Sequence, residues 1–311
     1  MPANIETMFY NSENGVPWHG LGNSVEGTLD SEQALVQSGL MWGVEKRPLV
    51  TEDGLQTDHF ATVRMTDNKV LGVVGARYEI LQNREAFDWT DQLLGEGVRY
   101  ETAGSLREGR RIWLLARLEE SHFILGDEFI PYMVFSNSHD GTSAVNVAIT
   151  PVRVVCQNTL SIALRETTRR WSARHTSSLN NDNTKIREAQ NTLKLTGQYM
   201  SELEREAYRL ADKRISLEEY VERLIPMPAN SLPDSRPANN VNELREDIYA
   251  RAAREDLRKY RGTAWQFIQA IADHTSHVKS QRETETHEER RFEALIDGHK
   301  VQRKAMQLVA S

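Results

Sequence analysis

The sequence has a single cysteine and no long hydrophobic run. One thiol, Cys156, excludes an internal disulfide and a zinc site built from several thiolates. The apolar stretches are all much shorter than the roughly 20 residues that a membrane-spanning helix needs. The N-terminus also lacks the basic and apolar regions of a signal peptide. We therefore expect a cytoplasmic protein with no membrane association.

Motifs of the common nucleotide-driven enzymes are missing as well. The sequence has no phosphate-binding Gly-Lys loop, no dinucleotide fingerprint and no Gly-x-Ser-x-Gly elbow in a supporting context. We expect no cofactor, no bound metal and no assigned catalytic residue. An enzymatic alternative would need Cys156 or His19 as its chemistry.

Basic residues are scarce only at the beginning of the chain. The net charge is −7, and residues 1–59 hold two basic and nine acidic side chains, so the remaining residues are balanced. The global charge therefore does not exclude a nucleic-acid surface in the rest of the molecule.

The first half has the patterns of an α+β fold with a mainly antiparallel sheet and packed helices. Asp30 with Gln33 forms a predicted capping box, and an Asp-Gly pair at 140–141 is a strong hairpin signal. Asn158 is expected to begin a helix that continues through residue 164. We assign residues 1–175 to this domain. The predicted strands are Phe60–Met65, Val70–Val74, Arg111–Leu118, Phe129–Ser136 and Ala144–Val155, and Asn83–Leu94 is a predicted helix.

Residues 176–311 are expected to form an all-helical region. A heptad pattern indicates a helix over 185–211, a proline-rich loop follows at 226–237, and further helices are expected within 243–310. The seam is imperfect at Thr196, and Gly197 weakens the helix. It could drive oligomerisation, or it could pack against later helices of the same chain.

The stretch from residue 153 to residue 174 is the strongest candidate for a binding site. It has five arginines against one glutamate, with a tryptophan among them. Clustered arginines can contact a phosphate backbone, and an indole can stack on a base. The alternative is that the arginines form ion pairs on a solvated face. The predicted nucleic-acid-binding residues are Arg153, Arg165, Arg169, Arg170, Trp171 and Arg174.

Three weaker candidates are each explained at least as well by structure. Trp18 and His19 could contact a base, but the surrounding glycines also suit a tight turn with Trp18 in the core. Cys156 with His139 could form a nucleophilic pair, although a small buried cysteine is the commoner case. A second arginine cluster at 107–111 is typical of a solvated turn.

His274 and His277 lie three residues apart on a predicted helix and could be metal ligands. A metal site needs a third or fourth ligand, and the sequence offers only a possible His287. A solvated helix face explains the pair equally directly.

Several ordered segments resemble those of the phage/plasmid-like protein family, which is built on a domain of unknown function. The resemblance covers nearly the whole chain and implies an origin in a bacteriophage, a plasmid or another mobile element. It implies no particular activity. The segments are Met1–Met8, Pro17–Gly22, Tyr78–Asn83, Tyr100–Leu106, Asp140–Ser143, Pro151–Leu160 and Gly262–Trp265.

A further similarity concerns the order of elements. The segment from about Arg111 to Arg170 is expected to have antiparallel strands followed by a helix. This order is similar to that in the core of the phage single-strand annealing recombinases, and the analogy concerns the fold alone. We therefore expect a non-enzymatic, homo-oligomeric protein that binds single-stranded DNA. The alternative is a host-takeover protein whose helical half binds host or phage proteins.

Overall fold

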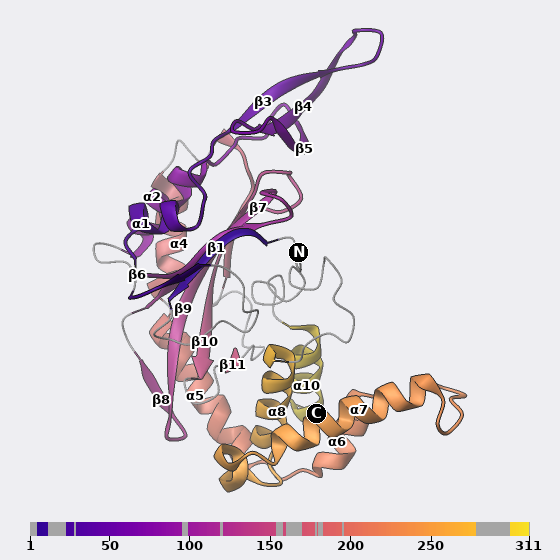
Figure 1. The fold of residues 1–311 in the computed structure, drawn as a ribbon. Helices are drawn as coiled ribbons and strands as arrows, with labels where there is room; N and C mark the ends of the chain where they lie inside the picture. Colours follow the sequence, from indigo (N-terminus) through magenta and orange to yellow (C-terminus); the bar gives the residue numbers. More distant parts are fainter. Residues whose placement is uncertain are drawn as a thin grey trace.

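A computed structural model of the chain describes residues 5–11, 23–27, 29–94, 99–118, 121–153, 158–159, 170–177, 179, 183–194, 196–277 and 299–310. The fold is mixed α+β, with two mainly antiparallel sheets and with helices that gather toward the C-terminus (Figure 1). The predicted α+β class with mainly antiparallel sheets is confirmed, and the predicted all-helical C-terminal region is confirmed in part.

The large sheet has the strand order β11-β10-β9-β7-β6-β1-β2, with β12 beside β10 and β8 beside β9. Its central strands coincide with the predicted ones, and Gly141 makes the β9–β10 turn with a φ of 73°. Only the β1–β2 pair is parallel among the described strands of this sheet. The strands are β1 (Ile5–Asn11), β2 (Asn23–Val25), β6 (Arg99–Leu106), β7 (Arg111–Arg117), β8 (His122–Ile124), β9 (Asp127–Ser138), β10 (Val145–Arg153), β11 (Asn158–Thr159) and β12 (Arg170–Ala173).

The helix predicted to follow a cap at Asn158 does not begin directly after it, because Thr159 is part of a strand. Asn158 and Thr159 form β11, which pairs with Arg153 and Val152 of β10. The edge of β10 offers unpaired backbone groups, and satisfying them outweighs the local helix signal of a capping asparagine. Residues 160–169, which carry the rest of that prediction, lie outside the described residues.

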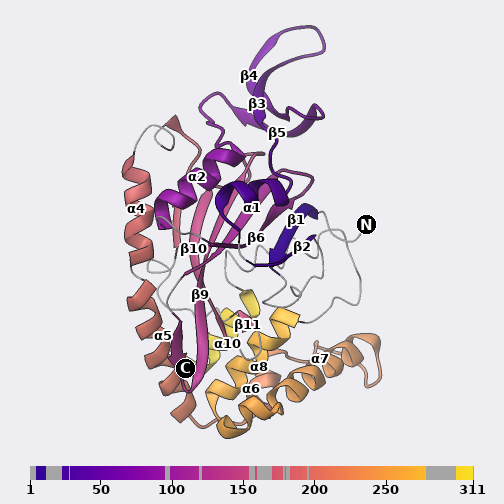
Figure 2. The same cartoon turned by 60° about the vertical axis from the view of Figure 1, so that its left-hand side comes forward.

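A small sheet of β3 (Val44–Val50), β4 (Gln56–Arg64) and β5 (Lys69–Gly75) projects from the large sheet (Figures 1 and 2). The predicted hairpin over residues 60–74 is confirmed. Gly72 lies against the β9–β10 turn, so close that a Cβ atom on it would come within 2.5 Å of Asp140 Cα. Only glycine permits this approach of two backbones.

We expect Gly72→Val to lower the free energy of unfolding by about 2 kcal/mol, because the added side chain pushes the small sheet away from the turn. Gly75→Val is the matched control on the same strand, since a Cβ atom at Gly75 meets nothing within 4 Å. Urea denaturation followed by circular dichroism measures both variants. Equal stability of the two would contradict the close contact.

Helices α1 (Ser31–Gln37), α2 (Asn83–Leu94), α4 (Asn183–Lys194) and α5 (Thr196–Asp212) lie along one face of the large sheet (Figure 2). The predicted capping box at Asp30 is confirmed at the start of α1. The heptad seam faces this core through Ala189, Leu193, Met200 and Leu203, all buried. The seam therefore packs against the same chain.

The remaining helices gather at one end of the molecule (Figure 1). Helix α7 begins at Arg236, earlier than predicted, because Pro237 sits in the first turn, where its missing N–H is tolerated. The proline-rich loop is therefore shorter than the predicted 226–237. These helices are α6 (Leu217–Leu224), α7 (Arg236–Ala252), α8 (Ala264–His277) and α10 (Lys300–Ala310), with a 3-10 helix, η3, at Glu255–Tyr260.

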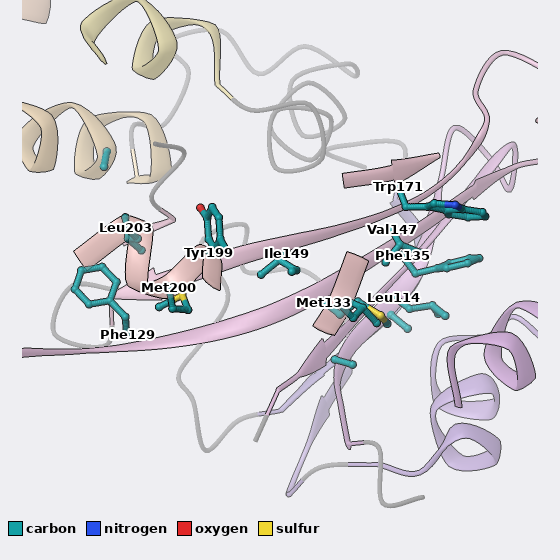
Figure 3. Close-up of a cluster of buried hydrophobic side chains, with 14 of the residues drawn as sticks. Leu114, Phe129, Met133, Phe135, Val147, Ile149, Trp171, Tyr199, Met200 and Leu203 are labelled. Atoms are coloured by element: carbon teal, nitrogen blue, oxygen red, sulfur yellow. The ribbon is translucent and has the colours of Figure 1, made fainter. Parts of the chain in front are cut away.

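The hydrophobic core is continuous between the sheet and the C-terminal helices. Figure 3 shows Phe129 of β9 beside Met200 and Leu203 of α5, and Phe135 beside Trp171 at the other end. The domain boundary at residue 175 stays a prediction. Within the described part of the chain, no helix has the length and apolar character needed to span a bilayer.

Candidate nucleic-acid interface

Strand β12 separates two of the predicted binding residues onto opposite faces of the sheet. It pairs with β10, with Arg170 opposite Ala148 and Trp171 opposite Val147. Side chains alternate along a strand, and Val147 belongs to the core on the helix-covered face. Arg170 therefore lies on the other face, where it is exposed.

Trp171 is a core residue, with 9% of its surface exposed. Its ring lies 5.2 Å from that of Trp89, and its Nε1 donates to Glu188 Oε2 of α4 at 3.2 Å. Figure 3 shows it beside Phe135 and Val147. The expectation that Trp171 presents a stacking face is therefore corrected, because the strand alternation turns its indole into the core.

The other predicted arginines are placed only in part. Arg174 follows β12 directly and is exposed. Arg153 ends β10, five residues beyond the partner of Arg170, which is about 17 Å along a strand. Arg165 and Arg169 lie outside the described residues. Arg170 and Arg174 are thus the two predicted residues whose side chains the structure describes as exposed.

Arg170 is linked to a second arginine through two polar residues, the buried Asn146 and the half-buried Ser143. Its Nη2 and Nε donate to Asn146 Oδ1 at 2.7 and 3.2 Å. The Asn146 amide nitrogen in turn donates to Ser143 Oγ at 3.3 Å, and Arg111 Nη2 reaches the same hydroxyl at 3.4 Å. Asn146 is 1% exposed. The chain of contacts fixes two guanidinium groups near the same end of the sheet.

The second predicted arginine cluster belongs to this end of the sheet. Arg107, Glu108 and Gly109 all have positive φ values in the β6–β7 turn, and Glu108 forms an ion pair with Lys69 at 2.8 Å. Arg110 is exposed, as expected for a solvated turn. Arg111 is instead buried in β7, opposite Ser138 of β9. The fold thus connects one arginine of this cluster, Arg111, to Arg170 through Ser143 and Asn146.

The segment 78–83, one of those that carry the family resemblance, positions the adjoining turn. The Asn83 amide nitrogen donates to the carbonyls of Leu40 and Trp42, and its Oδ1 contacts His139 Nε2 at 2.8 Å. The Tyr78 hydroxyl donates to the Ser138 carbonyl. These bonds tie the β9–β10 turn to the start of α2 and to residues 40–42, the segment that leads into β3 of the small sheet.

Two buried histidines complete this polar cluster. His175 Nδ1 contacts the Glu79 carbonyl at 3.1 Å, and its ring stacks on Tyr78. Because both contacted oxygens accept, His139 is protonated on Nε2 and His175 on Nδ1. Burial, with His175 nearby, lowers the pKa of His139 to about 3, and burial also lowers the pKa of His175. Both imidazoles are therefore neutral at pH 7 and act as structural links.

The alternative Cys156–His139 pair is not assembled by the described residues. Cys156 lies outside them, as do Trp18 and His19. The imidazole of His139 is buried and bonded to Asn83, on the core side of the sheet.

His274 and His277 each bond to a carboxylate. His274 Nδ1 is 2.6 Å from Asp247 Oδ2, and His277 Nδ1 is 2.8 Å from Asp273 Oδ1. His287 lies outside the described residues. In the part of the chain that the structure describes, no three His, Cys, Asp or Glu side chains are grouped to hold a metal ion.

Sequence reasoning missed the residues that connect the arginines. Ser143 and Asn146 follow the predicted Asp-Gly turn. The hairpin that this turn forms is enough to place them beside β9. Their link to Arg111 depends on β7 pairing with β9, which has no local signal. The burial of Asn146 could have been suspected from its position in an otherwise apolar strand.

Comparison with known proteins gives one match. A family model described as a domain of unknown function, DUF932, matches residues 70–296, which is well over half of the chain. Searches of curated proteins and of solved structures found no match. The match includes the β9–β10 turn, β12 and helices α4 to α8.

Proposed function

The chain belongs to the DUF932 family of domains of unknown function, and from its own geometry we propose that it binds single-stranded nucleic acid without catalysing a reaction. The observation that carries this proposal is the exposed Arg170, held by buried Asn146 and linked through Ser143 to Arg111. Exposed Arg174 extends the same basic surface.

The arrangement suits contacts to a phosphate backbone. Residues two apart on a strand are about 6.6 Å apart, so Arg170 and Arg174 are separated by about 13 Å where the chain stays extended, enough to contact different phosphates. A guanidinium whose orientation is fixed by Asn146 loses less conformational freedom on binding. With Trp171 buried, binding depends on phosphate contacts more than on base stacking.

The finer parts of the proposal follow from the family resemblance and the order of the strands. The protein acts in the cytoplasm, is encoded by a phage or plasmid, forms a homo-oligomer and promotes annealing of complementary strands. The antiparallel run of β7, β9 and β10 supports the analogy with annealing recombinases. That analogy concerns fold alone.

The test is a salt titration of oligothymidylate binding by fluorescence anisotropy. We expect the double variant Arg170→Ala/Arg174→Ala to bind about tenfold more weakly at low salt, with a slope of log K against log salt smaller by about 1 to 2. The matched control is Arg187→Ala/Arg205→Ala, which removes two exposed arginines from α4 and α5. The control should retain wild-type affinity.

Undetectable binding by the wild-type protein at low salt would contradict the proposal. Equal losses in the two double variants would show general electrostatic attraction in place of a defined surface. Competition with duplex DNA of the same sequence tests the preference for single strands, and tighter duplex binding would overturn it.

A second candidate function rests on the loop between α6 and α7. Leu232 is 73% exposed and Met227 is 40% exposed, and both lie in the arm that extends from the helical end (Figure 1). Exposed apolar side chains of this kind suit a protein partner. Retention of one specific protein by the full chain, lost in Leu232→Glu and kept in Arg170→Ala, would favour this function.

A further inference from the structure

A pocket of about 410 Å³ lies where the C-terminal end of α2 meets the junction of α4 and α5. Strand β8 and the start of the neighbouring β9 segment close its other side through His122 and Pro131. Figure 2 shows α4 and α5 following one another along this side of the sheet. The pocket is remote from Arg170 in sequence and shares no lining residue with the proposed nucleic-acid surface.

The pocket arises from the imperfection in the heptad seam. A regular seam would place large apolar side chains at each turn, whereas here Thr196 and Gly197 start α5. The Thr196 hydroxyl donates to the Leu193 carbonyl, which turns it back onto the end of α4. A Cβ atom at Gly197 would meet nothing within 4 Å. The short side chain at the seam position Thr196, with Gly197 next to it, therefore leaves a space beside the leucines of the lining.

The lining combines an apolar floor with basic side chains at the rim. Leucines form the floor, together with Pro131. Lys194 is exposed and makes no ion pair with any described residue, and His122 lies beside it in the lining. None of the described residues that line the pocket is acidic. The leucines are Leu93, Leu94, Leu118 and Leu193.

We propose that this pocket binds a small amphipathic anion, with an apolar chain on the leucine floor and a carboxylate at Lys194. Pockets of this size with apolar walls and a few polar groups are typical of small-molecule sites. Lys194 makes no ion pair with a described residue, and the described lining residues include no acidic side chain, so the pocket favours a negative head group over a neutral one. The apolar chain of the ligand takes the place of a large side chain at the seam position Thr196.

Isothermal titration calorimetry with monomeric dodecanoate tests the proposal on the full-length protein. We expect saturable binding, at least tenfold weaker binding of neutral dodecanol, and a loss of about tenfold in Lys194→Glu. Gly197→Leu should weaken binding at least tenfold, because Gly197 lines the pocket and a Cβ atom there meets nothing within 4 Å, so a larger side chain competes with the ligand for the same space. Arg187→Glu is the control for general charge, because Arg187 lies on α4 outside the lining.

Unaltered circular dichroism and thermal unfolding of Gly197→Leu would show that the fold is intact, so that its loss of binding reports on the pocket. Absence of saturable dodecanoate binding would overturn the proposal. Equal affinity of wild-type protein and Gly197→Leu would place the ligand elsewhere and also overturn it. Equal affinity for dodecanoate and dodecanol would remove the role of Lys194.

Discussion

The free energy of unfolding of the wild-type protein is expected to fall more steeply than that of His139→Gln as the pH is lowered from 6.5 to 4. The difference between the two slopes should be about 1.4 kcal/mol per pH unit. Burial, with His175 nearby, lowers the pKa of His139 to about 3 in the folded protein. In the unfolded chain the pKa of a histidine is about 6.5. Over this range the unfolded state therefore binds a proton that the folded state excludes.

The sign follows from that difference in protonation. The contribution of the neutral His139 imidazole to the free energy of unfolding is fully present above pH 6.5. It is lost as the pH falls toward the pKa of His139 in the folded protein. The groups that face His139 are Asn83, whose Oδ1 accepts from Nε2, the ring of Trp42 at 5.4 Å, and His175, a second base that also lowers the pKa of His139. No described carboxylate contacts the His139 ring to stabilise a positive charge.

Guanidinium unfolding at a series of pH values measures the two profiles. His59→Gln is the control, because His59 is exposed on β4. NMR of the His139 ring gives an independent readout, and its Hε1 shift should stay constant between pH 7.5 and pH 4.5. Parallel stability profiles, or a ring that titrates near pH 6.5, would contradict the burial of a neutral imidazole.

The sheet could be predicted where local signals agree with the tertiary structure. The strand patterns of residues 129–136 and 144–155 and the Asp-Gly turn between them favour the same hairpin, and the structure has it. Asn158 shows the limit, because a capping residue favours a helix only when no strand edge competes for its backbone. Pro237 shows a second limit, because proline permits the first turn of a helix as readily as it ends one.

The candidate site could be predicted only in part, because its parts are distant in the sequence. The basic character of the segment around Arg170 was readable, yet the face of each side chain depends on the register of β12 against β10. A shift by one residue would have exposed Trp171 and buried Arg170. Arg111 joins the site through two strands that lie between it and β12. No local pattern contains that adjacency.

Asp273→Ala is expected to lower the free energy of unfolding by about 3 kcal/mol. The Asp273 carboxylate is 3% exposed and contacts Arg251 at 3.1 Å, Arg254 at 3.2 Å and His277 at 2.8 Å. Burial alone would raise the pKa of Asp273, but these three partners outweigh it and hold the pKa below its usual value. Removing the carboxylate leaves partly buried positive charge between α7 and α8.

Chemical denaturation at pH 7 measures this loss against Glu206→Ala as the control. Glu206 pairs with Arg209 on the surface of α5, and a surface pair of this kind contributes at most about 1 kcal/mol. Asp273→Asn separates the two contributions of the carboxylate, because the amide keeps an acceptor oxygen but no charge. We expect Asp273→Asn to lie between wild type and Asp273→Ala. An Asp273→Ala variant within 1 kcal/mol of wild type would contradict the network, because the contacts between α7 and α8 would then depend on apolar packing alone.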